Sequence, residues 1–127
     1  MRTFLFLAGI NGFLAVALGA FGAHGLKRRL LPLVDGAQRL EWWQTAAHYH
    51  LAHALALGLV AVLAARVTGG LPRTAGWAFQ VGILLFSGSL YAMTLSGVRA
   101  LGAVTPLGGV GLLVGWACVA AAALRLG

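Results

Sequence analysis

Four long stretches of this chain contain no charged residue. Asp, Glu, Lys and Arg are absent from residues 3–26, 42–65, 74–98 and 100–124. Each stretch exceeds the roughly 20 apolar residues that an α-helix needs to cross the hydrocarbon core of a bilayer. The sequence therefore predicts an all-α membrane protein with four transmembrane helices. The expected spans are about 3–25, 42–65, 74–97 and 106–125, in a single domain formed by residues 1–127.

The overall composition agrees with this interpretation. Hydrophobic residues make up 61% of the chain and charged residues 9%, against about 45–50% and 25% in globular domains. The first apolar run is also longer than the core of a secretory signal peptide, so we expect it to be a membrane helix. These features indicate a multi-pass protein of the cell membrane.

The segment between the first two runs has a different pattern. From Leu30 to Leu40, apolar residues recur every three or four positions, and charged residues fall mostly on the other side. This spacing predicts a short amphipathic helix in the membrane interface. It would end at Trp42-Trp43, because tryptophan favours the headgroup level. Asp35 and Arg39 are four residues apart and are expected to form an ion pair.

Small residues recur in alternating steps of three and four along all four expected helices. This 3.5-residue period keeps one seam against a neighbouring helix in a left-handed bundle, and small residues let the backbones approach. We therefore expect a left-handed four-helix bundle with close contacts at glycines. The expected packing positions are Gly12, Gly19, Gly22, Gly82, Gly108, Gly111 and Gly115.

Glycine and proline mark the expected ends of the helices. Gly25 would end the first helix as its C-terminal cap. Residues 68–72 would form the turn between the second and third helices. Thr105 would cap the fourth helix, with Pro106 as its first residue.

The net charge of +7 does not indicate a nucleic-acid-binding protein. The nine Lys and Arg residues lie at the ends of the apolar runs, where they meet lipid headgroups. The expected partner is therefore the lipid bilayer and not a nucleic acid. Cys118 is the only cysteine and lies within the last run, so neither a disulfide within the chain nor a cysteine-based metal site is expected.

Polar side chains within the apolar runs are the candidates for function, because a membrane core tolerates few of them. On the second helix, His50 and His53 lie about 60° apart, whereas His48 lies well over 100° from both. His50 and His53 could supply two metal ligands, but a third would have to come from another element. The candidate cluster comprises His24, Tyr49, His50, His53, Ser87, Ser89 and Tyr91.

The inventory for catalysis is poor. The only carboxylates, Asp35 and Glu41, lie in the first loop, so no Ser-His-Asp arrangement can form at membrane depth. We therefore expect no enzymatic activity, no cofactor and no metal site. His53 is expected to be neutral and to face the bundle interior. Its expected partner is a serine of the third helix or Tyr91, with Tyr49 as a local alternative.

Four ordered motifs resemble those of a known family. They are GAFGAHG at residues 19–25, W-x-T-x-x-x-Y-x-x-x-H at 43–53, LFSGSLY at 85–91, and TPLGG at 105–109 followed by Gly115-Trp116. Nearly the whole chain resembles the domain of unknown function 423 family, which includes bacterial inner-membrane proteins and eukaryotic transmembrane protein 256. The resemblance implies a small multi-spanning membrane protein without an established activity. It draws attention to the motif residues His24, Tyr49, His53, Ser87, Ser89 and Tyr91.

Three functions remain open at this point. We expect a non-enzymatic structural or accessory component of a membrane assembly, as a homo-oligomer or within a larger complex. The first alternative is a small permeation or binding unit that handles a proton, an ion or a lipid-like molecule through the His/Tyr/Ser cluster. The second is a haem, quinone or metal site on His50 and His53.

Overall fold

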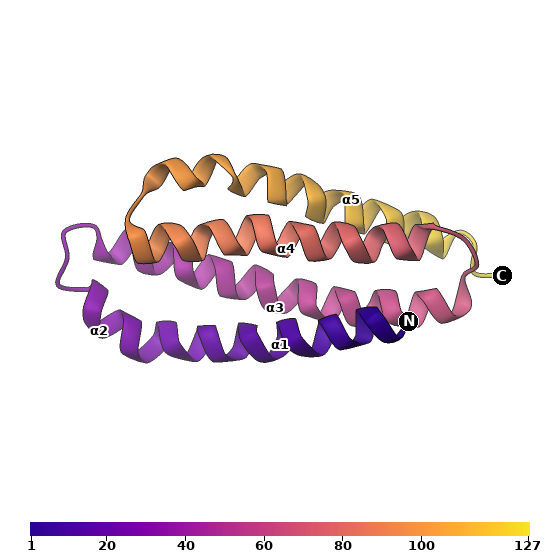
Figure 1. The fold of residues 1–127 in the computed structure, drawn as a ribbon, viewed down its shortest axis with the longest axis horizontal. Coiled ribbons are helices and arrows are strands. Elements are labelled where there is room, and N and C mark those ends of the chain that lie inside the picture. Colours follow the sequence, from indigo (N-terminus) through magenta and orange to yellow (C-terminus); the bar gives the residue numbers. More distant parts are fainter.

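The protein consists of four antiparallel helical segments joined by short connections (Figure 1). The computed structural model describes all residues from 1 to 127. The first segment contains α1 (Arg2–Phe21), a wide π-helical turn η1 (Gly22–Leu26) and α2 (Lys27–Leu30). It is followed by α3 (Gly36–Arg66), α4 (Leu71–Ser96), a 3-10 helix η2 (Arg99–Ala103) and α5 (Thr105–Ala123). Both termini lie at the same end of the molecule (Figure 1).

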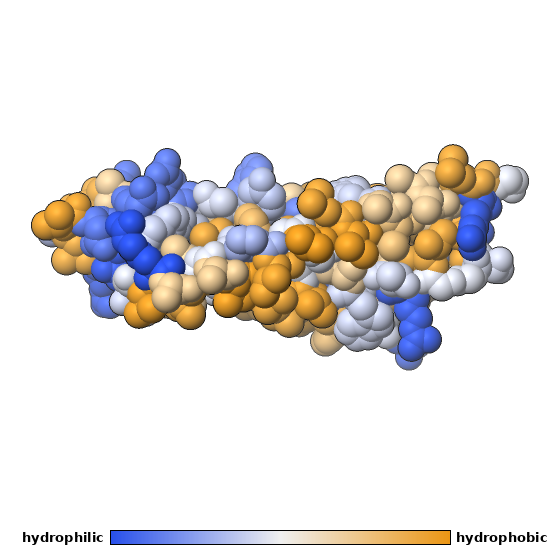
Figure 2. Space-filling view, turned by 90° about the horizontal axis from the view of Figure 1, so that it is seen from above, coloured by the Kyte–Doolittle hydropathy of each residue, from blue (hydrophilic) through white to orange (hydrophobic).

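Four helical segments are long and apolar enough to cross a membrane, which confirms the four predicted spans. They run from Arg2 to Leu30, Gly36 to Arg66, Leu71 to Ser96 and Arg99 to Ala123. Figure 2 shows polar residues gathered at both ends of the molecule and mostly apolar residues between them, with a few polar side chains in the apolar band. This distribution matches a bilayer, in which headgroups meet the charged ends and acyl chains meet the middle.

Two helices form the inside of the bundle and two lie outside it. α3 and α4 pack on one another, α1 packs on α3, and α5 packs on α4. The buried share of the membrane-spanning window is 50% in α3 and 44% in α4, but only 17% in the first segment and 22% in the last. We call α3 and α4 the inner pair, and α1 and α5 the outer helices. Since the outer helices share no substantial contact with each other, each is held by the inner pair alone.

The largest apolar cluster lies in the half of the bundle nearer the termini. Leu57 and Val60 of α3 and Phe79 of α4 are fully buried there, and the nine-residue cluster also includes Phe4 of α1 and Leu112 of α5. The inner pair thus supplies most of the core, and each outer helix contributes one large side chain to it.

The expected interfacial helix between the first two spans does not form as a separate element. Helix continues through Gly25 to Leu30, and Pro32 then stops it, because proline lacks an N–H and disfavours helix at the preceding residue. After a turn at residues 31–35, α3 begins at Gly36, six residues earlier than the expected Trp42. Only glycine fits at position 36, because a Cβ there would overlap the carbonyl of Leu30.

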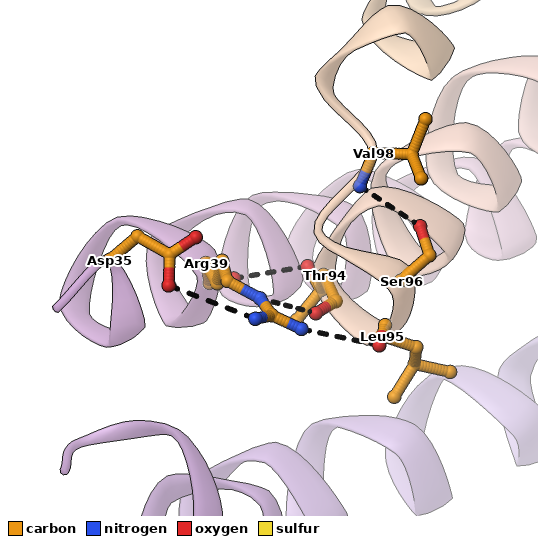
Figure 3. Close-up of polar contacts among 6 residues, drawn as sticks. All are labelled: Asp35, Arg39, Thr94, Leu95, Ser96 and Val98. Carbon is orange, nitrogen blue, oxygen red and sulfur yellow. Dashed lines mark hydrogen bonds and ion pairs between the residues drawn. The ribbon is translucent and has the colours of Figure 1, made fainter. Parts of the chain in front are cut away.

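A cluster of polar contacts joins the start of α3 to the end of α4 (Figure 3). The predicted Asp35–Arg39 ion pair is confirmed, with 3.7 Å between the carboxylate Oδ1 and Nη1. Arg39 also donates from Nε to the carbonyl of Thr94 at 2.8 Å and from Nη2 to the carbonyl of Leu95 at 3.2 Å. These carbonyls belong to the last turn of α4 and lack helical partners, so the guanidinium caps that helix. In return, the Thr94 hydroxyl donates to the Arg39 carbonyl at 3.0 Å.

The other helix ends lie close to the predicted ones. α4 ends at Ser96, and Gly97 follows with a φ of 72°, a left-handed conformation that glycine adopts without strain. α5 begins at Thr105, with Pro106 in its first turn as expected. Thr105 itself is helical and its side chain does not cap the helix, which corrects its predicted role.

Candidate functional site

Two buried histidines on α3 organise two separate polar clusters. His50 and His53 are 5% and 6% exposed, and they lie three residues apart. Both histidines lie on one side of α3, as the sequence predicted. Their partners on the outer helices differ, because one histidine bonds to α1 and the other bonds to α5. His50 bonds to α1 and α4, whereas His53 bonds to α5.

The α1-side cluster is a chain of four side chains: Asn11, Gln80, His50 and Tyr91. The Asn11 amide donates to Gln80 Oε1 at 2.9 Å and to the Leu7 carbonyl at 2.8 Å. Because its nitrogen donates twice, its oxygen accepts from His50 Nε2 at 3.1 Å. The other ring nitrogen, Nδ1, then accepts from the Tyr91 hydroxyl at 3.0 Å. This sequence of donors and acceptors defines the Nε2–H tautomer of a neutral His50.

The α5-side cluster fixes the opposite tautomer. His53 Nδ1 lies 2.7 Å from the Tyr49 carbonyl, which can only accept, so this nitrogen carries the proton. The indole N–H of Trp116 donates to His53 Nε2 at 3.1 Å. The Tyr49 ring lies nearly parallel to the imidazole, with 6.0 Å between centroids and 8° between planes. A second proton on His53 would displace the Trp116 N–H, so this arrangement holds a neutral ring.

The serines of α4 join helices by hydrogen bonds to other groups. Ser87 donates to the Ala46 carbonyl of α3 at 2.8 Å. Ser89 donates to the Phe86 carbonyl at 2.9 Å, so its oxygen accepts from the Thr105 hydroxyl of α5 at 2.6 Å. These bonds connect α4 to α3 and to α5.

The expectation for His53 was right about the buried position and wrong about the partner on another helix. No α4 serine reaches it, and Tyr91 bonds to His50 instead. The helix that reaches His53 is α5, through Trp116, while Tyr49 contributes only its backbone carbonyl.

Sequence reasoning missed three members of these clusters. Asn11 and Gln80 both lie within long apolar runs, and Asn11 is the only asparagine in the chain. A polar amide inside an apolar run is itself a reason to expect a buried hydrogen-bonded site, so the sequence could have identified both residues. Trp116 was noted as a motif residue, but its indole N–H was not considered as a donor. A buried tryptophan N–H normally needs an acceptor, which again could have been used.

His50 and His53 do not converge on a common site, as the metal or haem alternative on these two residues would need. Both ring nitrogens of His50 and of His53 already take part in hydrogen bonds on different flanks of α3. No three side chains among His, Cys, Asp and Glu lie close enough to hold a metal ion. His24 is exposed in η1 and forms no side-chain hydrogen bond with either cluster.

The glycines predicted to pack differ between the α5 flank and the α1 flank of the inner pair. A Cβ at Gly108 would overlap the α4 backbone at Leu85 and Phe86, and one at Gly111 would lie 3.3 Å from the Ala78 carbonyl. Cβ atoms at Gly82 and Gly115 would meet side chains, which are Leu112 at 2.6 Å and Phe79. The four glycines therefore line the contact between α4 and α5.

In the first segment, only one of the three predicted glycines is in a tight contact, and it lies in η1. A Cβ at Gly22 would overlap the Trp43 indole. Gly19 has room, because the nearest atom to an added Cβ is Ala47 Cβ at 3.9 Å. Gly12 has nothing within 4 Å, so the contact expected there is wrong. The 3.5-residue pattern on α1 reflects its richness in small residues more than its packing.

Each cluster borders a cavity that opens toward the surrounding lipid. A groove of about 440 Å³ lies beside the α5-side cluster and is bounded by Tyr49, His53, Phe86, Pro106 and Trp116, among others. A smaller cavity of about 160 Å³ lies beside the α1-side cluster, next to Asn11, His50, Ser87 and Tyr91. No buried side-chain nitrogen or oxygen is left without a hydrogen-bond partner.

Comparison with known proteins identifies the family. The family model described as "Protein of unknown function (DUF423)" matches residues 18–109. The UPF0382 membrane protein YwdK of Bacillus subtilis (strain 168) is 45% identical over 126 residues, 98% of each chain. The UPF0382 inner membrane protein YgdD of Escherichia coli (strain K12) is 42% identical over 126 residues, 98% of this chain and 92% of its own. No solved structure matches. The chain is therefore an integral membrane protein and belongs to the DUF423 family, as its motifs indicated.

Proposed function

We propose that this protein is a non-enzymatic structural or accessory component of a membrane assembly. The observation that carries the proposal is the self-contained polar interior. Every buried polar side-chain atom is paired within the chain, and the two histidines use all four ring nitrogens in doing so. Groups engaged in this way fix which helices meet and at what depth, which is what a scaffold requires.

The position of the charged residues supports the same proposal. Asp35 and Glu41, the only carboxylates, lie at one end of the bundle, and Asp35 is paired with Arg39. A proton path or acid–base site at membrane depth normally uses a carboxylate or a histidine with a free ring nitrogen. Neither is present among the buried side chains of this bundle.

Copurification from native membranes tests the proposal. The tagged chain, extracted in mild detergent or polymer nanodiscs, is expected to bring down a reproducible set of membrane proteins, which quantitative mass spectrometry identifies. The matched control is a tagged, unrelated four-helix membrane protein expressed at the same level. Recovery of the chain without specific partners, together with proton or ion flux in proteoliposomes, would contradict the accessory role.

A second candidate function is the binding of a lipid-like molecule in the 440 Å³ groove. The Tyr49 ring borders this groove, and its hydroxyl makes no hydrogen bond within the chain, so it is free to bond a polar group of an apolar ligand. Native mass spectrometry would detect such a ligand. Val110→Trp should fill the groove and displace it, whereas Val114→Trp, four residues along α5 and outside the lining, should not.

A further inference from the structure

Three polar side chains near the start of the uncharged stretch of α3 face outward without a hydrogen-bond partner in the chain. Gln44, Thr45 and His48 are all exposed, and none takes part in a side-chain hydrogen bond. We call these residues the outer polar stripe. It lies on the side of α3 that neither α1 nor α4 covers.

The depth of His48 makes the stripe unusual. The uncharged stretch of α3 begins at Trp42. By the helical rise, Gln44 and Thr45 lie about 3 and 4.5 Å beyond Trp42, close to the interface, whereas His48 lies about 9 Å beyond it, within the hydrocarbon. An imidazole at this depth meets acyl chains, which offer no hydrogen bonds.

We propose that the outer polar stripe is the contact surface with a second copy of this chain. The inference rests on the accessory role proposed above and names the first partner in that assembly. Two copies inserted in the same orientation are related by a twofold axis along the membrane normal, so residues of α3 that lie next to the axis meet the same residues of the other copy. A stripe residue next to the axis must therefore bond to its own kind.

The chemistry of the stripe meets this requirement. A glutamine amide, a hydroxyl and a neutral imidazole each contain both a donor and an acceptor, so each can pair with its own copy. A surface of only donors or only acceptors could not do so. Hydrogen bonds between helices are an important source of association in a bilayer, where burial of apolar surface contributes little.

The same face continues beyond the stripe with apolar residues at the spacing of a helix–helix seam. From Thr45 the steps alternate between three and four residues, and every residue reached is exposed. The seam comprises Thr45, His48, Ala52, Leu55, Leu59 and Val62. Ala52, one turn beyond His48, lets the two backbones approach at that depth. At the headgroup end, Glu41 remains hydrated and accepts from Gln38 Nε2 at 3.4 Å.

Cysteine cross-linking in native membranes tests the contact. Cys118→Ala removes the only cysteine, and Ala52→Cys then places a thiol on the seam. Phe13→Cys on α1 and Leu113→Cys on α5 are the matched controls, since both side chains are exposed, at 74% and 71%. A membrane-permeant oxidant should give a homodimer with Ala52→Cys, at least tenfold more than with either control. Equal yields on all three faces, or a product with a different protein in place of the homodimer, would overturn the proposal.

Association in vesicles isolates the role of His48. His48→Leu should raise the dimer dissociation constant about tenfold in a fluorescence-transfer titration, because paired imidazoles are lost. His48→Gln, which keeps a donor and an acceptor, should retain the dimer, and His24→Leu, off the seam, should not change it. A monomeric wild-type chain, or identical dissociation constants for His48→Leu and wild type, would refute the inference. Monomers that still copurify with a defined set of other membrane proteins would refute it while leaving the accessory role intact.

Discussion

The two outer helices are attached to the same inner pair by different means. α1 is held through side-chain hydrogen bonds, from Asn11 to His50 and Gln80 and from Trp43 Nε1 to the Leu18 carbonyl at 2.7 Å. α5 is held mainly through close approach of its backbone to α4, at Gly108 and Gly111. Burial of apolar surface contributes little between helices in lipid, so either hydrogen bonding or close packing must take its place. In this small bundle hydrogen bonding dominates on the α1 flank and close packing dominates on the α5 flank.

The difference predicts different sensitivities. A flank held by backbone approach should be intolerant of a single added methyl group and indifferent to the loss of one hydrogen bond. A flank held by a chain of side chains should be sensitive to the loss of those hydrogen bonds. Four substitutions test this contrast, from the largest expected effect to the smallest.

Gly108→Ala should be the most damaging change on the α5 flank. The new Cβ would overlap the backbone of α4 at Leu85 and Phe86, which cannot rotate away, so we expect a loss of about 3 kcal/mol in unfolding free energy. Gly109→Ala is the control, because its Cβ would lie 3.8 Å from Phe86 Cδ2, an ordinary contact. Unfolding in bicelles, measured by steric trapping, gives both values. Equal stabilities for the two variants would show that α5 is not held by backbone approach.

Asn11→Leu should cause the largest loss on the α1 flank. It removes the bonds to His50, Gln80 and the Leu7 carbonyl and leaves buried groups without partners, for an expected loss of about 2 kcal/mol. The same assay applies, with Gly12→Ala as control, since position 12 has open space around it. If Asn11→Leu is as stable as Gly12→Ala, the polar chain does not hold α1.

Trp116→Phe removes the only hydrogen bond between His53 and another side chain and should cost about 1 kcal/mol or less, since α5 keeps its glycine contacts. Nitrogen NMR of labelled histidine provides a second measurement. Wild-type protein should show His53 as the Nδ1–H tautomer and His50 as the Nε2–H tautomer. The variant should shift the His53 signals and leave those of His50 unchanged. Two histidines with the same tautomer would contradict the hydrogen-bond assignment.

Gly19→Ala should have the smallest effect, within about 0.5 kcal/mol and toward higher stability. The new methyl group fits at 3.9 Å from Ala47, and alanine favours helix over glycine. Gly22→Ala, one turn along the same helix, should be destabilising because its Cβ would overlap the Trp43 indole. Thermal unfolding in detergent distinguishes the two variants. A marked loss of stability in Gly19→Ala would support the continuous glycine seam that the sequence predicted.

The sequence predicted the four spans because charge is excluded from the bilayer core wherever a helix crosses it, as at residues 3–26 and 74–98. It failed at residues 30–41, where a three- and four-residue spacing suited both an interfacial helix and the first turns of α3. Pro32 and Gly36 decided between them, the first by stopping a helix and the second by fitting against the Leu30 carbonyl. Local pattern could not reveal that contact between two segments.

The polar clusters were harder to predict than the spans. Tyr49, His50, His53, Ser87, Ser89 and Tyr91 stood out as polar residues in apolar runs, and the structure buries both histidines and both serines. Which side chain bonds to which depends on the depth at which each helix lies, and the sequence does not give that depth. Asn11 pairs with a glutamine 69 positions away for this reason.

The order of synthesis gives the α1-side cluster a further consequence. The ribosome makes α1 first, so Asn11 emerges before either His50 or Gln80 exists. Its amide must enter the membrane without the partners it has in the finished bundle, apart from the Leu7 carbonyl of its own helix. The first segment has the highest mean hydropathy of the four, which allows it to insert alone. When the α3–α4 hairpin enters the membrane, Asn11 gains its hydrogen bonds to His50 and Gln80, and this gain favours docking of the hairpin on α1.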